Sequence, residues 1–136
     1  MNQVMPSDKK AILIEISVGE LVDKITILEL KVEHFIDPYS LNIVNDELAH
    51  LNQVFVENVN SSPKLFELID QLRSANRKLW QLENRIRHFE KVGDFSDEFI
   101  QVARSICQTN DSRSDVKKQI NEMMQSRFIE QKNYRI

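Results

Sequence analysis

Apolar residues recur at intervals of three and four along most of the chain, a spacing typical of amphipathic α-helices. The first series begins after Ser17, whose spacing from Glu20 predicts a capping box, and Asp37-Pro38 predicts its end. A second helix is expected to follow. The apolar positions of these two helices are Leu21, Ile25, Leu28, Val32 and Phe35, then Leu41, Val44, Leu48, Leu51 and Phe55.

Capping signals also set the limits of two longer helices. Ser62 and Pro63 predict the cap and first residue of a third helix, which should run to Val92 and end at Gly93. Ser96 predicts the cap of a fourth helix, with a break or kink at 109–111 and a continuation through Met124. Short connections between four helices predict an all-α, up-down bundle.

Residues 11–16, Ala-Ile-Leu-Ile-Glu-Ile, are β-prone and predict a short N-terminal β-strand. An otherwise helical monomer offers such a strand no neighbour for its backbone groups. Pairing with its copy in a second chain would satisfy them, which indicates a homo-oligomer, most simply a dimer.

The length of 136 residues predicts one helical domain, 1–136, with 1–10 and 127–136 flexible or peripheral. Two glycines and three prolines are too few for a β-sandwich or barrel. The net charge of −3 argues against a nucleic-acid partner, and no apolar run is long enough to predict a membrane partner. A single cysteine and the lack of an export signal predict a cytoplasmic location.

The expected third helix carries two parallel seams. The apolar one predicts core: Leu65, Leu68, Leu72, Ala75, Leu79, Leu82, Ile86 and Phe89. The second lies one residue further round, about 100° away, and therefore borders the core. It consists of Arg73, Asn76, Trp80, Glu83, Arg87 and Glu90. A wholly exposed tryptophan would waste a large apolar surface, so this seam should face a helix, a subunit or a ligand.

Asn110 and Arg113 fall where the period of the fourth helix predicts burial. A buried arginine requires a carboxylate partner, for which Glu83, Glu20 and Asp23 are the candidates. Such a cluster would be either an ion-pair network that fixes helix register or a ligand site.

Few residues suggest metal or covalent chemistry. Glu20 and Asp23, three residues apart, could bind Mg²⁺, although this spacing is common in helices. The histidines lack zinc-site spacing, Cys107 is expected to be a buried core thiol, and no motif indicates a cofactor.

Three stretches together resemble a family of small bacterial helical proteins of unknown function. Residues 19–31 resemble its opening, GELxDKxTILxxK. Asn76-x3-Trp80-x2-Glu83-x2-Ile86-Arg87 resembles its middle motif, and the run from 99 to 121, with ARSIxxTNDxR at its centre, resembles a later one. The resemblance covers about half of the chain. It implies a link to surface-polysaccharide and glycosyltransferase pathways and supplies no catalytic residue.

Periodicity and resemblance together give one set of candidate ligand-binding residues: Lys24, Lys31, Asn76, Trp80, Glu83, Arg87, Arg104, Asn110, Arg113 and Lys117. We favour an oligomeric accessory or interaction protein, because Trp80 and the N-terminal strand both call for a protein neighbour. The alternative is a protein that binds, or hydrolyses with Mg²⁺, an anionic small molecule such as a nucleotide or nucleotide sugar. An open pocket among the polar residues would favour the alternative.

Overall fold

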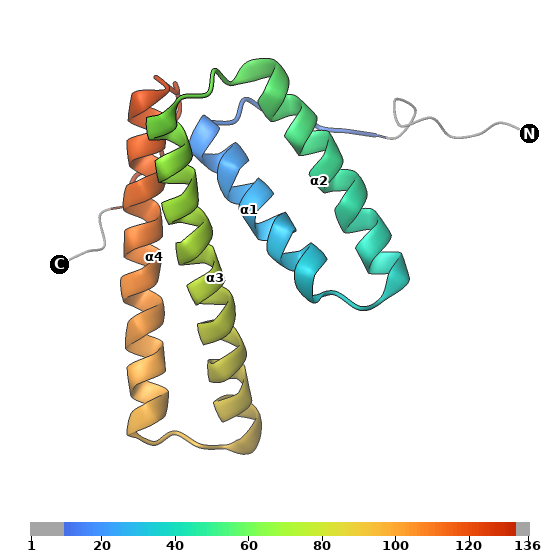
Figure 1. Cartoon of the computed structure of the whole chain (residues 1–136). Helices are drawn as coiled ribbons and strands as arrows, with labels where there is room; N and C mark the ends of the chain where they lie inside the picture. The colour runs from blue at the N-terminus through green and yellow to red at the C-terminus, as the bar shows by residue number, and fades with distance from the viewer. Residues whose placement is uncertain (1–9, 133–136) are drawn as a thin grey trace, which may run out of the picture.

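A computed structural model describes residues 10–132, which contain four helices in up-down order (Figure 1). They are α1 (Val18–His34), α2 (Pro38–Asn58), α3 (Pro63–Val92) and α4 (Asp97–Met123). The predicted all-α class and number of helices are confirmed for these residues. None of the four is long and apolar enough to cross a membrane. The expected terminal segments lie partly outside the described residues, at 1–9 and 133–136.

Local capping fixes most of the helix ends. The Ser17 hydroxyl accepts a hydrogen bond from the Glu20 amide at 3.1 Å, as the capping box predicts, but the Glu20 side chain turns to α4 instead of reaching back. Asp37 caps α2, and Ser62 caps α3 by accepting from the Leu65 amide. Gly93 ends α3 with a φ of 72°, a left-handed conformation that glycine adopts without strain.

The helices form two antiparallel hairpins that diverge from one end of the molecule (Figure 1). In one hairpin α3 packs along α4, and in the other α1 packs along α2. The two meet because α1 also contacts α3 and α4, whereas α2 lies on the outer side of α1. The bundle is therefore open. Of the five predicted apolar positions of α2, Val44 alone is fully buried.

The core lies where the hairpins join. Leu65, Leu68 and Leu72 of α3 are at most 2 % exposed, so the first half of the predicted apolar seam is core. Burying one such side chain favours folding by about 1.5–3 kcal/mol. The other members of this cluster are Leu21, Val22, Ile25, Val59, Ile69, Val116 and Ile120.

The predicted break at 109–111 is wrong, because α4 is one continuous helix through these residues. Thr109 is buried against the rest of the protein, and Asn110 is half-buried. Packing along α3 thus outweighs the tendency of Thr, Asn and Asp to leave the helix.

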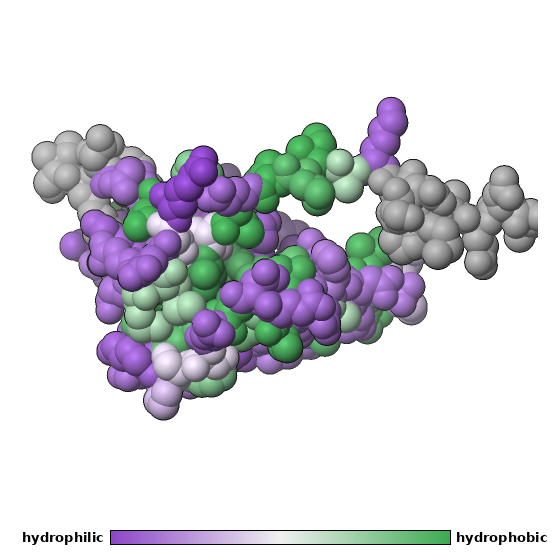
Figure 2. All heavy atoms as spheres, turned by 90° about the horizontal axis from the view of Figure 1, so that it is seen from above, coloured by the Kyte–Doolittle hydropathy of each residue, from purple (hydrophilic) through white to green (hydrophobic). Residues whose placement is uncertain are grey.

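The predicted strand at 11–16 is also not formed. This segment follows an extended course before α1 (Figure 1), but no strand exists among residues 10–132, so it lacks a neighbour with which to pair. Ile12, Leu13 and Ile14 are 92 %, 91 % and 78 % exposed. Figure 2 shows the segment as a run of apolar atoms that stands away from the helices.

Gly19 brings the start of α1 against α4. A Cβ built there would lie 2.7 Å from Asn121 Oδ1 and 2.8 Å from the backbone oxygen of Lys117. An alanine in a helix normally stabilises it relative to glycine. Here Gly19→Ala should lower the free energy of unfolding by about 1–3 kcal/mol, because the two helices must move apart. Urea unfolding followed by circular dichroism measures this, and a more stable variant would contradict the close approach.

Candidate functional site

The Asp23 carboxylate is buried at the junction of α1, α3 and α4, at 3 % exposure. Its Oδ1 accepts hydrogen bonds from Asn76 Nδ2 at 2.8 Å and Arg113 Nε at 3.2 Å. Its Oδ2 accepts from Arg113 Nη2 at 2.5 Å. Asn76 also donates to the Thr26 hydroxyl at 2.8 Å. One carboxylate on α1 therefore binds side chains from both helices of the other hairpin.

Lys117 lies one turn along α4 from Arg113 and extends the same network. Its Nζ is 2.6 Å from a Glu20 oxygen, 3.5 Å from Asp23 and 3.4 Å from Glu130. Burial disfavours the charged ammonium, but the hydrogen bond to Glu20 and the charges of Asp23 and Glu20 outweigh it. The pKa of Lys117 is therefore raised above its ordinary value of 10.5.

Further contacts hold the α1–α4 junction. The Gly19 amide donates to Asn121 Oδ1 at 2.6 Å, and the Val18 amide donates to the Ser126 hydroxyl at 3.1 Å. Both amides belong to the first turn of α1, where no earlier carbonyl of the helix can accept from them. Side chains at the end of α4 and in the segment after it thus accept the hydrogen bonds that an earlier turn of α1 would otherwise accept.

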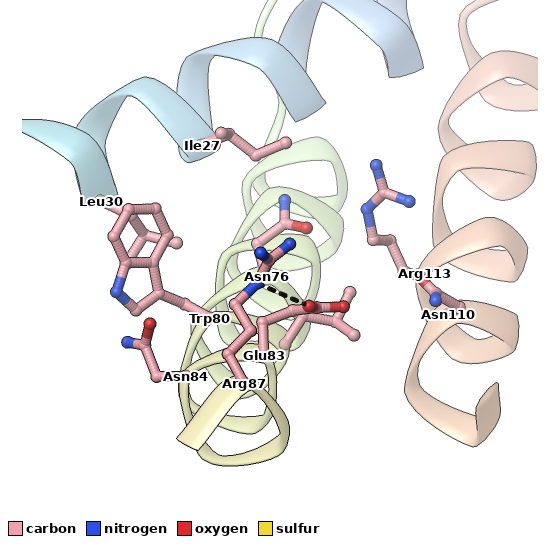
Figure 3. A pocket seen from close by; sticks show the side chains of 10 residues that line it. Ile27, Leu30, Asn76, Trp80, Glu83, Asn84, Arg87, Asn110 and Arg113 are labelled. Atoms are coloured by element: carbon pink, nitrogen blue, oxygen red, sulfur yellow. Dashed lines mark ion pairs between the residues drawn. The ribbon is translucent and has the colours of Figure 1, made fainter. Parts of the chain in front are cut away.

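A cleft of about 410 Å³ opens beside this network, between the diverging hairpins. Figure 3 shows Arg113 and Asn110 reaching in from α4, opposite Trp80, Asn84 and the Glu83–Arg87 pair on α3. Ile27 and Leu30 of α1 cover one side. The remaining lining residues are Asn76 and Leu79.

Arg113 connects the buried network to the cleft. Its Nε and Nη2 bind Asp23, while Nη1 has no hydrogen-bond partner among residues 10–132. An arginine held along one edge by a carboxylate presents its remaining N–H groups in a fixed direction. A rigid donor therefore stands in the wall of the cleft.

Trp80 provides an aromatic surface on the opposite wall. Its ring lies 4.9 Å from the His34 ring, centroid to centroid, at an interplanar angle of 32°. His34 is held in turn by a 2.8 Å hydrogen bond between its Nδ1 and the Leu30 carbonyl. Trp80 is half-buried, so its surface is shared between α1 and the cleft.

The residues of the second, polar seam of α3 lie in two environments, one against α1 and one at the cleft. Arg73 pairs with Glu29 of α1 at 2.9 Å, and this hydrogen bond raises the pKa of Arg73 despite its partial burial. Arg87 is exposed and lies 3.5 Å from Glu83. The seam therefore faces α1 over its first turns and the cleft further along, as a seam that borders the core should.

Six of the ten candidate ligand-binding residues line the cleft: Asn76, Trp80, Glu83, Arg87, Asn110 and Arg113. Lys117 belongs to the buried network behind it. Lys24 borders a different hollow, near residues 14–17 and 127–130, and neither Lys31 nor Arg104 lines the cleft. The network is closed around Asp23, whereas the cleft beside it is open.

The two carboxylates proposed for Mg²⁺ are both engaged by cations, Glu20 by Lys117 and Asp23 by Arg113 and Lys117. No group of three or more potential metal-binding side chains occurs within residues 10–132. Positive side chains at ion-pair distance repel a divalent cation, so this arrangement does not favour a magnesium site. Cys107 is exposed, and the expectation of a buried core thiol is wrong.

Sequence reasoning missed several residues of the site. Thr26 and Asn121 are small or polar side chains on buried helix faces, and only their contacts reveal that they bind Asn76 and the Gly19 amide. Glu130 lies in a segment without periodicity. Gly19 gave the one usable signal, because a glycine in the first turn of a helix often marks a close approach.

The chain belongs to a family of unknown function, DUF6165, whose model matches residues 12–136. The resemblance drawn from the sequence is thus confirmed at the level of a family without an assigned function. Neither a curated protein nor a solved structure matches the chain.

The roles of Asp23 and Arg113 in stability can be separated by substitution. Asp23→Ala leaves Arg113 and Asn76 without their partner and should cost about 3–5 kcal/mol of unfolding free energy. Arg113→Met should cost less, about 1–3 kcal/mol, because Asp23 keeps Asn76 and Lys117. Urea unfolding measures both. Arg77→Met, which removes an exposed ion pair with Glu33, is the control and should change stability little. Equal losses for Asp23→Ala and Arg113→Met would contradict a shared carboxylate.

The raised pKa of Lys117 predicts a loss of stability at alkaline pH. Charged Lys117 stabilises the fold fully below the unfolded-state pKa of 10.5, and this contribution disappears as pH rises through the higher folded-state pKa. The difference in unfolding free energy between wild type and Lys117→Met should be constant from about pH 8 to about pH 10 and shrink above that. A difference that stays constant to about pH 11.5 would show that the network does not depend on the ammonium charge.

Proposed function

We propose that the protein is a binding module for a small molecule that combines a planar ring with a phosphate or carboxylate group. The observation that carries this proposal is Arg113, whose guanidinium is held by buried Asp23 while one N–H edge remains open to the cleft. A donor fixed in advance loses little conformational entropy when an anion binds to it.

The composition of the cleft supports a ring at its other wall. Leu79 and Trp80 provide apolar and aromatic surface there, next to the almost fully buried Leu30. The amides of Asn84 and Asn110 can accept or donate hydrogen bonds beside it, whereas Asn76, whose Nδ2 already donates to Asp23 and Thr26, can only accept. A volume of about 410 Å³ lies within the range usual for ligand pockets.

The charges narrow the class of ligand. Glu83 offsets Arg87 at 3.5 Å, and Asp23 offsets Arg113, so the cleft carries no large excess of positive charge. A ligand is therefore expected to bind one anionic group at Arg113 and to gain the rest of its affinity from ring contact and hydrogen bonds. Nucleotides and nucleotide sugars meet this description. The pathway link implied by the family resemblance makes nucleotide sugars the first to test.

A second candidate is the oligomeric accessory or interaction role expected from the sequence, in a cytoplasmic protein of bacterial surface-polysaccharide pathways. The exposed apolar residues Ile12, Leu13 and Ile14 favour it, because solvated proteins rarely leave several large apolar side chains together in water. The two roles are compatible, since this segment does not line the cleft.

Trp80 is the sole tryptophan, so its fluorescence reports directly on the cleft. We expect a nucleoside diphosphate sugar or a nucleoside monophosphate to change this fluorescence in a saturable way. The free nucleoside should bind about tenfold or more weakly, because it lacks the anion for Arg113. Absence of any saturable change up to millimolar concentrations of all three ligands would contradict the proposal.

Substitutions inside and outside the cleft test whether the ligand binds there. Arg113→Lys keeps the charge but loses the fixed planar fork, and should weaken binding about tenfold. Asn110 lines the cleft without contacting Asp23, so Asn110→Ala tests the binding site while the Asp23 network stays intact. Arg85→Met removes an exposed ion pair with Glu98 outside the cleft and should bind like wild type. Equal weakening in Arg85→Met would show that binding is elsewhere or nonspecific.

A further inference from the structure

We propose that residues 10–16 form an antiparallel, two-stranded ribbon with the same residues of a second copy, which makes the protein a homodimer. The segment is extended and joins α1 at Ser17. Ile12, Leu13 and Ile14 are at least 78 % exposed, and the run stands clear of the helices (Figure 2). This inference does not depend on the ligand of the cleft.

The part of the chain that the structure describes offers this segment no partner of its own. Residues 10–132 contain no strand, and helices have no free row of backbone groups with which an extended segment could pair. An extended segment of another molecule could pair with its N–H and C=O groups, which are otherwise left to water. A second copy brings an identical segment at the same concentration as the first.

The side-chain pattern suits pairing with itself. Ile12, Ile14 and Ile16 alternate along the segment and share one face, while Ala11, Leu13 and Glu15 occupy the other. Two-fold antiparallel pairing centred on Leu13 places Ile12 opposite Ile14 of the second copy. The isoleucines of both copies then lie together on one face of the ribbon.

Charge favours antiparallel over parallel pairing. Lys10 lies at one end of the segment and Glu15 near the other, so antiparallel pairing brings ends of opposite charge together, although Lys10 shares the isoleucine face and does not face Glu15 directly. Parallel pairing would align lysine with lysine and glutamate with glutamate. In the register centred on Leu13, Glu15 faces Ala11 of the second copy, which keeps the two carboxylates apart.

The body of the protein provides a place for the ribbon to rest. Ile14 and Ile16 border a hollow together with Phe128 and Ile129 from the segment after α4. Phe128 is 52 % exposed there. Arg127 Nε lies 3.6 Å from Glu15 Oε2, and this ion pair holds the two segments beside each other. Ile12 of the second copy, opposite Ile14, would extend the apolar surface over this hollow.

The mass of the full chain in solution tests the proposal. Size-exclusion chromatography with light scattering at about 50 μM, well above a micromolar Kd, should give twice the 16.0 kDa of one chain. Ile12→Lys/Ile14→Lys should give one chain with unchanged helical circular dichroism. Ile36→Lys, at a site 90 % exposed in the loop between α1 and α2, should remain dimeric. A wild-type monomer would overturn the proposal, and so would a dimer that survives the double substitution.

Cysteine cross-linking tests the register. In a Cys107→Ser background, Leu13→Cys places two thiols opposite each other across the two-fold axis, within the Cα separation that a disulfide spans. Ala11→Cys on the same face separates the two thiols by four residues along the ribbon, or roughly 13 Å. Mild oxidation should give a covalent dimer of the first variant and little of the second. Equal yields would overturn this pairing, as would cross-linking of Ala11→Cys alone.

Discussion

The structure depends on the compensation of one buried carboxylate. Removing Asp23 from water costs several kcal/mol unless hydrogen bonds and positive charge replace the lost hydration. Asn76 of α3 and Arg113 and Lys117 of α4 provide that replacement. The donors come from both helices of the second hairpin, so α1 can satisfy Asp23 in only one orientation relative to α3 and α4. The ion pair between Glu20 and Lys117, one helical turn away, restricts the orientation of α1 relative to α4 in the same way.

The open shape follows from where this constraint acts. The apolar core and the Asp23 network lie toward the same end of the molecule, and beyond them the hairpins diverge. Trp80 thus lines a hollow instead of completing a core, and Arg113 faces both the network and the hollow. Structural and candidate binding roles meet in one side chain for this reason. A guanidinium whose orientation is fixed by the fold needs no rearrangement before it binds an anion.

Short-range features were predictable from the sequence because their causes are local. Ser17, Ser62 and Gly93 act on the backbone of their own helix ends, and the structure places them as expected. The pairing of a buried arginine with a carboxylate was also predictable, since the alternative is an uncompensated charge. Which carboxylate it would be was not, because Glu20, Asp23 and Glu83 differ only in helix packing.

The sequence predictions that were wrong rested on local preferences, which contacts between distant parts of the chain, or the lack of such contacts, override. Thr109, Asn110 and Asp111 favour a helix break on local grounds, but contacts with other helices keep α4 continuous. The β-prone residues 11–16 lack a neighbouring strand within the described chain, so their local preference yields only extended backbone. Most of the apolar positions of α2 are less buried than periodicity implies, because the bundle is open and leaves whole helix faces uncovered. Cys107 is exposed too, although free cysteines are usually buried.

The joining of α1 to the end of α4 also determines when the fold can form during synthesis. Asp23 lies 90 residues before Arg113, Gly19 lies 102 before Asn121, and Val18 lies 108 before Ser126. At translation rates of about 5–20 residues per second, α1 leaves the ribosome on the order of 5–20 s before its charged partner. During that interval Asp23 stays hydrated, and the face of α1 that later packs against α4 remains uncovered. Such a chain completes its fold only after the last helix emerges, and loop closure over about a hundred residues makes that step slow compared with helix formation.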